Sequence, residues 1–137
     1  MLIVGNTKLK GRGVFAQKRF VKGEIIQKAP VVVIPAAEVG LIDQTILGNY
    51  YYDWENAAAA IAFGLVSLIN HSYQPNTYYV KKFTEKAIEY IALQDIEVGE
   101  EITANYNNGC PDDQSPLWFD TVEEISSLAI TNNSGVS

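Results

Sequence analysis

The sequence is poor in the residues that build metal sites and disulfide frameworks. Its 137 residues include one cysteine, Cys110, and one histidine, His71. A single cysteine excludes an internal disulfide and a multi-cysteine zinc site. No second histidine or cysteine stands at ligand spacing from His71, so we expect no metal site.

The chain also has little positive charge and no apolar run of membrane-spanning length. Residues 57–69 are mostly apolar but fall short of the ~20 residues that cross a bilayer, and the apolar start is too short for a signal peptide. Ten Lys and Arg residues against 16 Asp and Glu give a formal charge of −6. This disfavours nucleic-acid binding and is compatible with a basic protein partner. We expect a cytoplasmic protein without direct nucleic-acid or membrane contacts, export by an unrecognised route being the alternative.

Most of the chain has the pattern of short β-strands, which predicts one α+β domain that is mostly β. Apolar and β-branched runs indicate strands at residues 2–4, 14–16, 25–26, 31–34 and 102–106. Pro30 is expected to interrupt the run around it. Residues 77–82 and 87–93 are predicted to pair as an antiparallel hairpin.

One main helix is predicted, over residues 57 to about 64. Asn56 is a suitable N-cap, and four consecutive alanines favour helix strongly. Residues 40–48 contain apolar residues with only weak periodicity, so no element is assigned there. The polar tail, residues 131–137, is expected to be frayed.

Two short motifs are candidate sites. Gly11-Arg12-Gly13 lies between two predicted strands, where glycines allow close approach of a ligand, although a plain hairpin turn is the commoner meaning. It is not a dinucleotide-binding fingerprint, since a third glycine and a following helix are missing. Asn70-His71-Ser72 ends the apolar stretch, where polar groups must find partners or a ligand. A Ser72–His71 nucleophile pair is rejected, because adjacent residues rarely face each other. A lone histidine is more often structural.

Tyrosine is unusually frequent, with eight residues in the chain. Six of them fall at positions 50, 51, 52, 73, 78 and 79, and Tyr106 ends the last predicted strand. Taken singly, such tyrosines belong to cores and sheet surfaces. Gathered around one cavity, they would form an apolar channel with hydroxyl tips. Such a channel suits the apolar stem and polar end of a lysine side chain.

The order of four motifs along the chain is more informative than any one of them. The motifs are Gly11-Arg12-Gly13-Val14-Phe15-Ala16, Lys22-Gly23-Glu24, Ile69-Asn70-His71-Ser72-x-x-Pro75-Asn76 and Gly99-Glu100-Glu101-Ile102-Thr103-Ala104-Asn105-Tyr106. This order resembles the SET-domain family of protein lysine methyltransferases, over most of the chain. The compact length is similar to that of small viral and bacterial SET proteins. The resemblance implies a fold of several small sheets, in which two motif segments form a pseudoknot.

The resemblance also implies a cofactor, S-adenosylmethionine, and the residues that bind it. Gly11, Arg12 and Gly13 would lie against the methionine end of the cofactor. Asn70 would hydrogen-bond its amino group, and His71 would contact the adenine through its backbone. Asn70 is thus expected to supply the side-chain chemistry of its segment.

The catalytic side of the family site maps onto tyrosines. Tyr106 matches the catalytic tyrosine, which also lies against the cofactor. Tyr50 best matches the catalytic aromatic that lines the lysine channel, with Tyr51 as an alternative. Tyr52 is a further channel residue and a second alternative for that place.

Two other positions bear on how many methyl groups are added. Tyr79 and Ala104 match family positions at the end of the lysine channel. In the family, a tyrosine hydroxyl there tends to limit methylation. We therefore predict monomethylation or dimethylation.

The chemistry of methyl transfer to lysine fits these residue types. The amine must be neutral, and at pH 7 its deprotonation costs about 4.6 kcal/mol from a pKa of ~10.4. A nearby sulfonium cation and burial in an aromatic channel both lower that pKa, so no dedicated base is required. Tyr106 would orient the amine, which makes this mostly catalysis by positioning.

The sequence departs from the family after the last motif. The cysteine-rich, zinc-binding tail of many SET domains is absent, and Cys110 cannot replace it. Residues 1–107 would form the SET core and residues 108–137 a segment that closes the site. Trp118 is expected to stack on the adenine, with Phe119 as the alternative. Asn105 stands where the family usually has an aspartate.

These observations predict a protein-lysine N-methyltransferase acting on a histone tail or another basic protein. The first alternative is a SET module that binds a lysine peptide or the cofactor without turnover. The second is an assembly protein that uses the predicted apolar helix as its oligomer surface. A homodimer is expected to accompany catalysis.

Overall fold

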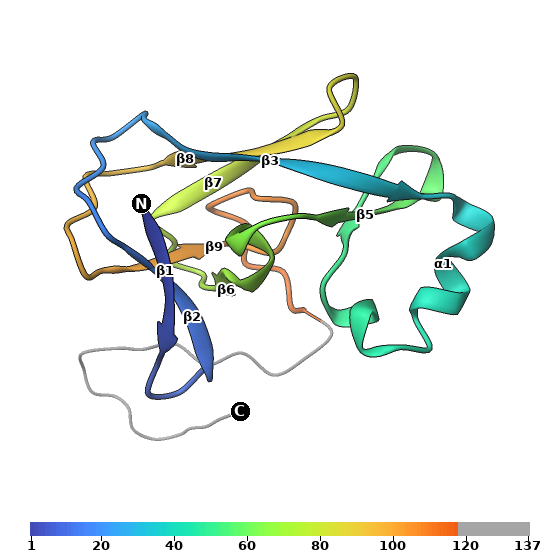
Figure 1. Cartoon of the computed structure of the whole chain (residues 1–137), viewed down its shortest axis with the longest axis horizontal. Coiled ribbons are helices and arrows are strands. Elements are labelled where there is room, and N and C mark those ends of the chain that lie inside the picture. Colours follow the sequence, from blue (N-terminus) through green and yellow to red (C-terminus); the bar gives the residue numbers. More distant parts are fainter. Residues whose placement is uncertain (118–137) are drawn as a thin grey trace.

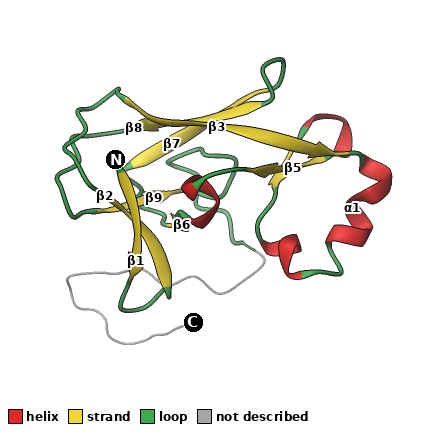
Figure 2. Cartoon of the chain, viewed as in Figure 1, coloured by secondary structure: helices red, strands yellow, loops and turns green. Residues whose placement is uncertain are grey.

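Most of the regular structure consists of β-strands, joined by loops and a few short helical segments, as Figures 1 and 2 show. A computed structural model describes residues 1–117. The strands in this part of the chain are β1 (Leu2–Asn6), β2 (Arg12–Ala16), β3 (Ile25–Ile34), β4 (Tyr52–Asp53), β5 (Ala59–Ala62), β6 (Asn70–His71), β7 (Thr77–Lys82), β8 (Ala87–Ala92) and β9 (Glu101–Ala104). The helices are α1 (Ala36–Ile42) and the 3-10 turns η1 (Ile46–Asn49), η2 (Glu55–Ala57) and η3 (Leu65–Leu68). The predicted α+β class, mostly β, is confirmed.

A four-stranded sheet in the order β1-β2-β9-β6 carries both motif segments. β1 and β2 form an antiparallel hairpin around Gly11, whose φ of +72° favours glycine. β9 pairs antiparallel to β2 at Val14 and Phe15. β6 pairs parallel to β9, with Asn70 opposite Thr103 and His71 opposite Ala104. This sheet therefore brings the glycine turn, the Asn-His segment and the last strand together.

The second sheet has five strands in the order β4-β5-β3-β8-β7. The predicted hairpin is found as β7 and β8, which pair antiparallel from Thr77–Ala92 to Lys82–Ala87. β3 is the long central strand at the top of Figure 1. It pairs with β8 up to Pro30 and with β5 from Val31 onward.

Pro30 does not interrupt β3, contrary to the prediction. Its carbonyl accepts a hydrogen bond from the Phe63 N–H on the β5 side of the strand. The N–H and C=O of one strand residue face the same side, so the missing proton donor of Pro30 falls at the end of the β5 pairing. No ladder bond is lost, and the strand continues.

The helix predicted over residues 57 to about 64 is wrong, because this segment forms β5 between two 3-10 turns. Asn56 and Ala57 have φ of +58° and +61°, so Asn56 does not cap a helix. Ala59 and Ala60 are fully buried between β3 and β4. Small side chains let neighbouring strands pack closely here, and tertiary packing overrides the helical propensity of alanine.

The α-helix of the described chain is α1, which lies at the end of the molecule away from the β1–β2 hairpin (Figure 1). Neither α1 nor η1 buries a residue fully. The core lies instead between the two sheets. Its largest fully buried side chains are Tyr90, Phe20, Ile69, Ile88, Ile96, Ile102, Val14 and Val66. Ile69 thus anchors the segment that leads into β6.

Candidate active site

The parallel pairing of β6 with β9 places the Asn-His segment beside the end of the last strand. Beyond the pairing of His71 with Ala104, the Ser72 N–H donates to the Ala104 carbonyl over 3.0 Å. β9 ends at Ala104, earlier than the predicted strand end at residue 106. Tyr106 therefore lies just past the strand, next to residues 69–71.

Gly13, Asn70 and Glu101 form a tight polar cluster at the glycine turn. The Asn70 Nδ2 amide donates to the Arg12 carbonyl over 2.9 Å and to the Glu101 carboxylate over 2.8 Å. A Cβ on Gly13 would lie 2.6 Å from Glu101 Oε2 and 3.0 Å from Asn70 Nδ2. A larger residue at position 13 would displace these side chains, so the glycine turn lies in close contact with the Asn70–Glu101 pair.

This cluster fits the charged amino group of an amino-acid cofactor. Both hydrogens of the Asn70 amide are engaged, which leaves its Oδ1 atom as an acceptor. Among the described residues, Oδ1 has no hydrogen-bond donor of its own. An ammonium group offers donors only, and Oδ1, the Arg12 carbonyl and the Glu101 carboxylate are all acceptors. Sequence reasoning missed Glu101, although it belongs to the quoted Gly-Glu-Glu motif.

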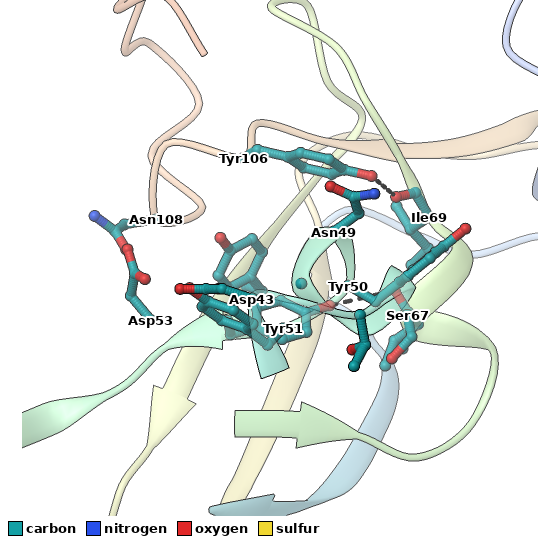
Figure 3. A pocket seen from close by; sticks show the side chains of 14 residues that line it. Asp43, Asn49, Tyr50, Tyr51, Asp53, Ser67, Ile69, Tyr106 and Asn108 are labelled. Carbon is teal, nitrogen blue, oxygen red and sulfur yellow. Dashed lines mark hydrogen bonds between the residues drawn. The ribbon is translucent and has the colours of Figure 1, made fainter. Parts of the chain in front are cut away.

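Tyr106 is attached to residues 69–71 at two points. Its hydroxyl donates to the Ile69 carbonyl, as Figure 3 shows, and its backbone N–H donates to the Nδ1 atom of His71 over 3.0 Å. Burial, followed by the neighbouring Tyr52, Tyr50 and Glu101 groups, raises the pKa of the Tyr106 phenol. The phenol therefore keeps its proton at neutral pH, and its proton is directed at Ile69.

The imidazole of His71 is engaged as well as its backbone. Its ring packs edge-on against the rings of Tyr73 and Tyr106, with centroid distances of 4.3 Å and 5.3 Å. Burial, followed by the Lys10 ammonium, lowers the pKa of His71 to about 4. The ring is therefore neutral, with its proton on Nε2, because Nδ1 accepts a hydrogen bond. The sequence interpretation gives the backbone of His71 more weight than its imidazole.

A tyrosine-lined cavity of about 510 Å³ opens next to Tyr106 (Figure 3). Its lining consists of Asp43, Thr45, Gly48, Asn49, Tyr50, Tyr51, Tyr52, Asp53, Val66, Ser67, Ile69, Tyr79, Tyr106 and Asn108. The predicted Tyr50, Tyr52, Tyr79 and Tyr106 thus come together. Tyr51 lines the cavity too, so Tyr50, Tyr51 and Tyr52 all remain candidates for the channel aromatic. We call this feature the tyrosine cavity.

The hydroxyls around the tyrosine cavity differ in what they contact. Tyr52 shares a 2.6 Å hydrogen bond with the buried Tyr90 hydroxyl, and burial raises the pKa of Tyr52 to about 12. The Tyr51 hydroxyl donates to Asp43 over 2.9 Å. The Tyr79 hydroxyl has no hydrogen-bond partner within the described part of the chain, although the residue is only 7% exposed. Tyr79 therefore brings an unpaired hydroxyl to the cavity.

Other predicted residues lie elsewhere. Ala104 is fully buried in β9 and does not line the tyrosine cavity. Trp118 and Phe119, the candidates for stacking on adenine, lie outside the described residues. Asn105 is fully buried, and its amide donates to the Asp113 carbonyl over 2.6 Å. A carboxylate has no such donor, which explains the asparagine at this position.

Several residues of the cavity were not predicted from the sequence. Asp43 follows α1, Asp53 ends β4 and Asn108 lies in the turn after β9, so their meeting at the cavity depends on the fold. Gly109 packs against β7, since a Cβ there would lie 2.7 Å from the Tyr79 carbonyl. Within residues 1–117, no group of three or more His, Cys, Asp or Glu side chains is arranged to hold a metal ion. No helix in this part of the chain is long and apolar enough to cross a membrane.

Known proteins share both the sequence pattern and the fold. The SET domain family matches residues 11–107. The chain is 33% identical over 129 residues to a protein of Schizosaccharomyces pombe, the histone-lysine N-methyltransferase that is specific for H3 lysine 37. The match covers 93% of this chain and 82% of that protein.

Solved structures match as well. A Plasmodium falciparum protein assigned as a histone methyltransferase has a TM-score of 0.60 at 28% identity, covering 78% of this chain and 97% of that one. Chaetomium thermophilum Polycomb Repressive Complex 2 has a TM-score of 0.66 at 22% identity, covering 82% of this chain and 16% of that one, which shows the fold alone. With the glycine turn, the Asn-His segment and Tyr106 gathered at one site, the chain belongs to the SET-domain family and is a protein-lysine N-methyltransferase.

Proposed function

We propose that this enzyme methylates a lysine of a histone tail, with histone H3 as the first substrate to test. The relative in Schizosaccharomyces pombe is named for histone H3 lysine 37, and this chain is acidic where a histone tail is basic. The observation that carries the proposal is the placement of Tyr106. Residues 69–71 hold its phenol at the tyrosine cavity. They also place Asn70 beside the Arg12 carbonyl and the Glu101 carboxylate, and we call this group of oxygen atoms, with Asn70 Oδ1, the acceptor cluster.

We propose that S-adenosylmethionine binds at that cluster. When bound, it supplies an activated methyl group on a sulfonium. Asn70 Oδ1, the Arg12 carbonyl and Glu101 would accept from its ammonium group, and Gly13 leaves space for it. The His71 backbone is proposed to contact the adenine, and the Gly11 turn the methionine end. Trp118 remains our candidate for the adenine stack.

The tyrosine cavity is suited to a neutral lysine amine. Its rings pack along the apolar stem, and their desolvation disfavours the charged ammonium. The Tyr106 hydroxyl donates to the Ile69 carbonyl, and we propose that the phenol oxygen acts as an acceptor toward the reacting amine. Tyr106 and Tyr50 are thus proposed to orient the substrate, and the proton of the amine leaves through water.

We propose that the enzyme adds one or two methyl groups. The Tyr79 hydroxyl, which has no hydrogen-bond partner among residues 1–117, can hydrogen-bond an amine that keeps at least one N–H. It also takes space that a third methyl group would need. Mass spectrometry of methylated peptide gives the distribution of products. Predominant trimethylation would contradict this proposal.

A methyl-transfer assay tests the function. Recombinant enzyme, labelled S-adenosylmethionine and histone H3 should give labelled H3, and Tyr106→Phe should lose at least ~100-fold in kcat while binding S-adenosylhomocysteine normally. Tyr78→Phe is the matched control, because Tyr78 lies on β7 outside the tyrosine cavity. Near-normal turnover by Tyr106→Phe would remove Tyr106 from catalysis. Cofactor binding without transfer to any protein would favour a binding module instead.

We also propose a homodimer and a cytoplasmic location, without direct nucleic-acid contact. α1 and η1 bury no residue fully and expose Leu41, Ile46 and Leu47, which supports a protein contact at this end of the molecule. Sedimentation equilibrium measures the mass of the assembly. A monomer at micromolar concentration would contradict the dimer.

A further inference from the structure

The backbone of Tyr106 continues past the end of a parallel ladder. Ser72 donates its N–H to the Ala104 carbonyl, which is the last ladder bond between the β6 segment and β9. In a parallel ladder, the residue that donates to one carbonyl accepts from the N–H two residues further on. Continuation of the ladder would therefore direct the Tyr106 N–H to the Ser72 carbonyl.

The chain takes a different path, because residue 72 begins a turn. The Gln74 N–H donates to the Ser72 hydroxyl over 2.9 Å, which bends the backbone away from β9. The partner of the Tyr106 N–H is the Nδ1 atom of His71, at 3.0 Å. A side chain thus replaces the backbone acceptor that a longer β6 would have supplied.

The His71 ring is held in the orientation that this bond needs. The residue is 6% exposed, and its ring packs edge-on against Tyr73 and Tyr106. Its Nε2 atom is buried and has no partner within the described residues. An unpaired buried N–H is unfavourable. The hydrogen bond of Nδ1 and the packing of the ring against the two tyrosines offset this cost.

We propose that His71 is a positioning residue for Tyr106: Nδ1 fixes the backbone of Tyr106 and thereby the location of its phenol at the tyrosine cavity. The hydroxyl bond to Ile69 holds one end of the residue and the bond to His71 holds the other. With only the hydroxyl bond, the Tyr106 backbone could shift along its loop. The effect on turnover rests on the proposed function, whereas the effect on the Tyr106 backbone does not.

Two substitutions of nearly equal size separate an acceptor from mere bulk. In His71→Asn, Oδ1 takes the place of Nδ1, while His71→Leu fills similar space without an acceptor. We expect His71→Leu to lose at least ~10-fold in kcat for an H3 peptide, with changes under ~3-fold in peptide KM and in S-adenosylhomocysteine Kd. His71→Asn should restore most of the lost kcat. Equal kcat values for the two variants would overturn the proposal, as would a loss confined to cofactor binding.

Amide hydrogen exchange gives a readout that does not depend on turnover. The Tyr106 amide should exchange at least ~10-fold faster in His71→Leu than in the wild type, and His71→Asn should restore the protection. If wild-type enzyme transfers no methyl group to any histone, the proposed function fails, and this exchange comparison still decides the role of His71. Should His71→Leu not fold, ¹⁵N spectra of the wild-type imidazole remain decisive. A proton on Nε2 supports the proposal, and a proton on Nδ1 overturns it.

Discussion

At the scale of single residues, the candidate site depends on a few close contacts. Gly13 is one of these residues, because a Cβ there would displace the Glu101 and Asn70 side chains. Asn70 is another, because its amide gives both protons to the protein and leaves its oxygen for a ligand. Substitution of either residue should therefore change the affinity for the cofactor.

Gly13→Ala should weaken cofactor binding and lower stability while the fold is retained. The added Cβ would lie 2.6 Å from Glu101 Oε2, so Glu101 and Asn70 must move out of the acceptor cluster. We expect the Kd for S-adenosylhomocysteine to rise at least ~10-fold, and the free energy of unfolding to fall by about 1–3 kcal/mol. Calorimetric titration measures the first change and urea denaturation the second.

Gly40→Ala is the control for this experiment. Gly40 lies in α1, where an added Cβ meets nothing within 4 Å, so the variant should bind the cofactor analogue normally. It should also gain up to about 1 kcal/mol from helix propensity. Equal Kd values for Gly13→Ala and Gly40→Ala would show that the glycine turn is not in the cofactor site.

His71 predicts a specific pH dependence of stability. Burial and then Lys10 lower its pKa to about 4, and Lys10 is the charged side chain that faces it, through a 3.3 Å bond to its carbonyl. The unfolded chain takes up a proton near pH 6.5 and the folded chain does not. The free energy of unfolding should therefore be constant above about pH 7 and fall by about 2 kcal/mol between about pH 7 and about pH 5.

Urea denaturation of wild type and His71→Asn at a series of pH values tests this dependence. His71 is the one histidine of the chain, and most carboxylates titrate below about pH 5. The variant should lose most of the slope in this window. A slope that survives unchanged in His71→Asn would assign it to another group.

At the scale of elements, the loop after β9 supports the tyrosine cavity by packing on β7. Gly109 has a φ of +76°, and a Cβ there would lie 2.7 Å from the Tyr79 carbonyl. Next to it, Asn108 accepts a 2.8 Å hydrogen bond from Lys81. The loop therefore holds the strand that carries Tyr79.

Gly109→Ala should disturb both the fold and the products. Strain at positive φ and the contact with β7 should lower the free energy of unfolding by about 1–3 kcal/mol. Displacement of Tyr79 should also shift the distribution of methylated products, which mass spectrometry detects. Unchanged stability and products would mean that the loop can move to accept the added Cβ without displacing Tyr79. Gly23→Ala is the control, because it shares a positive φ, +88°, with nothing nearby.

The elements also show which parts of the structure were predictable from sequence. The β7–β8 hairpin has local pairing and an apolar pattern, so it was predicted within one residue at each end. β5 was not, because its alanines satisfy helical propensity and only the close packing of β3 and β4 decides for strand. α1 was missed for the opposite reason, since a helix that buries no residue fully leaves little apolar periodicity.

The site residues also divide into those with a sequence motif and those that only the fold brings together. Asn70, Gly13 and Tyr106 were placed by the order of motifs, and the structure brings them together. The acidic lining residues Asp43 and Asp53 carry no motif of their own. The contact between the His71 ring and the Tyr106 backbone was hidden, because it depends on where β6 stops pairing with β9.

At the scale of the whole molecule, charge should govern substrate binding. The formal charge is −6, and Asp43 and Asp53 line the tyrosine cavity without any Lys or Arg among its lining residues. We expect the KM for a basic H3 peptide to rise at least ~5-fold between about 0.05 M and about 0.5 M NaCl, since salt screens exposed charges. The kcat should change little, because the reacting groups are buried.

Steady-state kinetics at several salt concentrations measure this effect. A peptide with its flanking Lys and Arg residues replaced by glutamine is the control, and its KM should respond less to salt. An identical salt response of the two peptides would locate the effect in the lysine itself.

The parallel pairing of β6 with β9 has a consequence for how the enzyme becomes active. Tyr106 is tied to Ile69 and His71 across 37 and 35 residues of chain, and Asn70 to Arg12 across 58. Contacts between such distant segments form only after long loops have closed, which is slow in folding. Catalytic competence should therefore appear in the last kinetic phase of refolding, together with the native core, and a nascent chain should remain inactive until β9 has been synthesised.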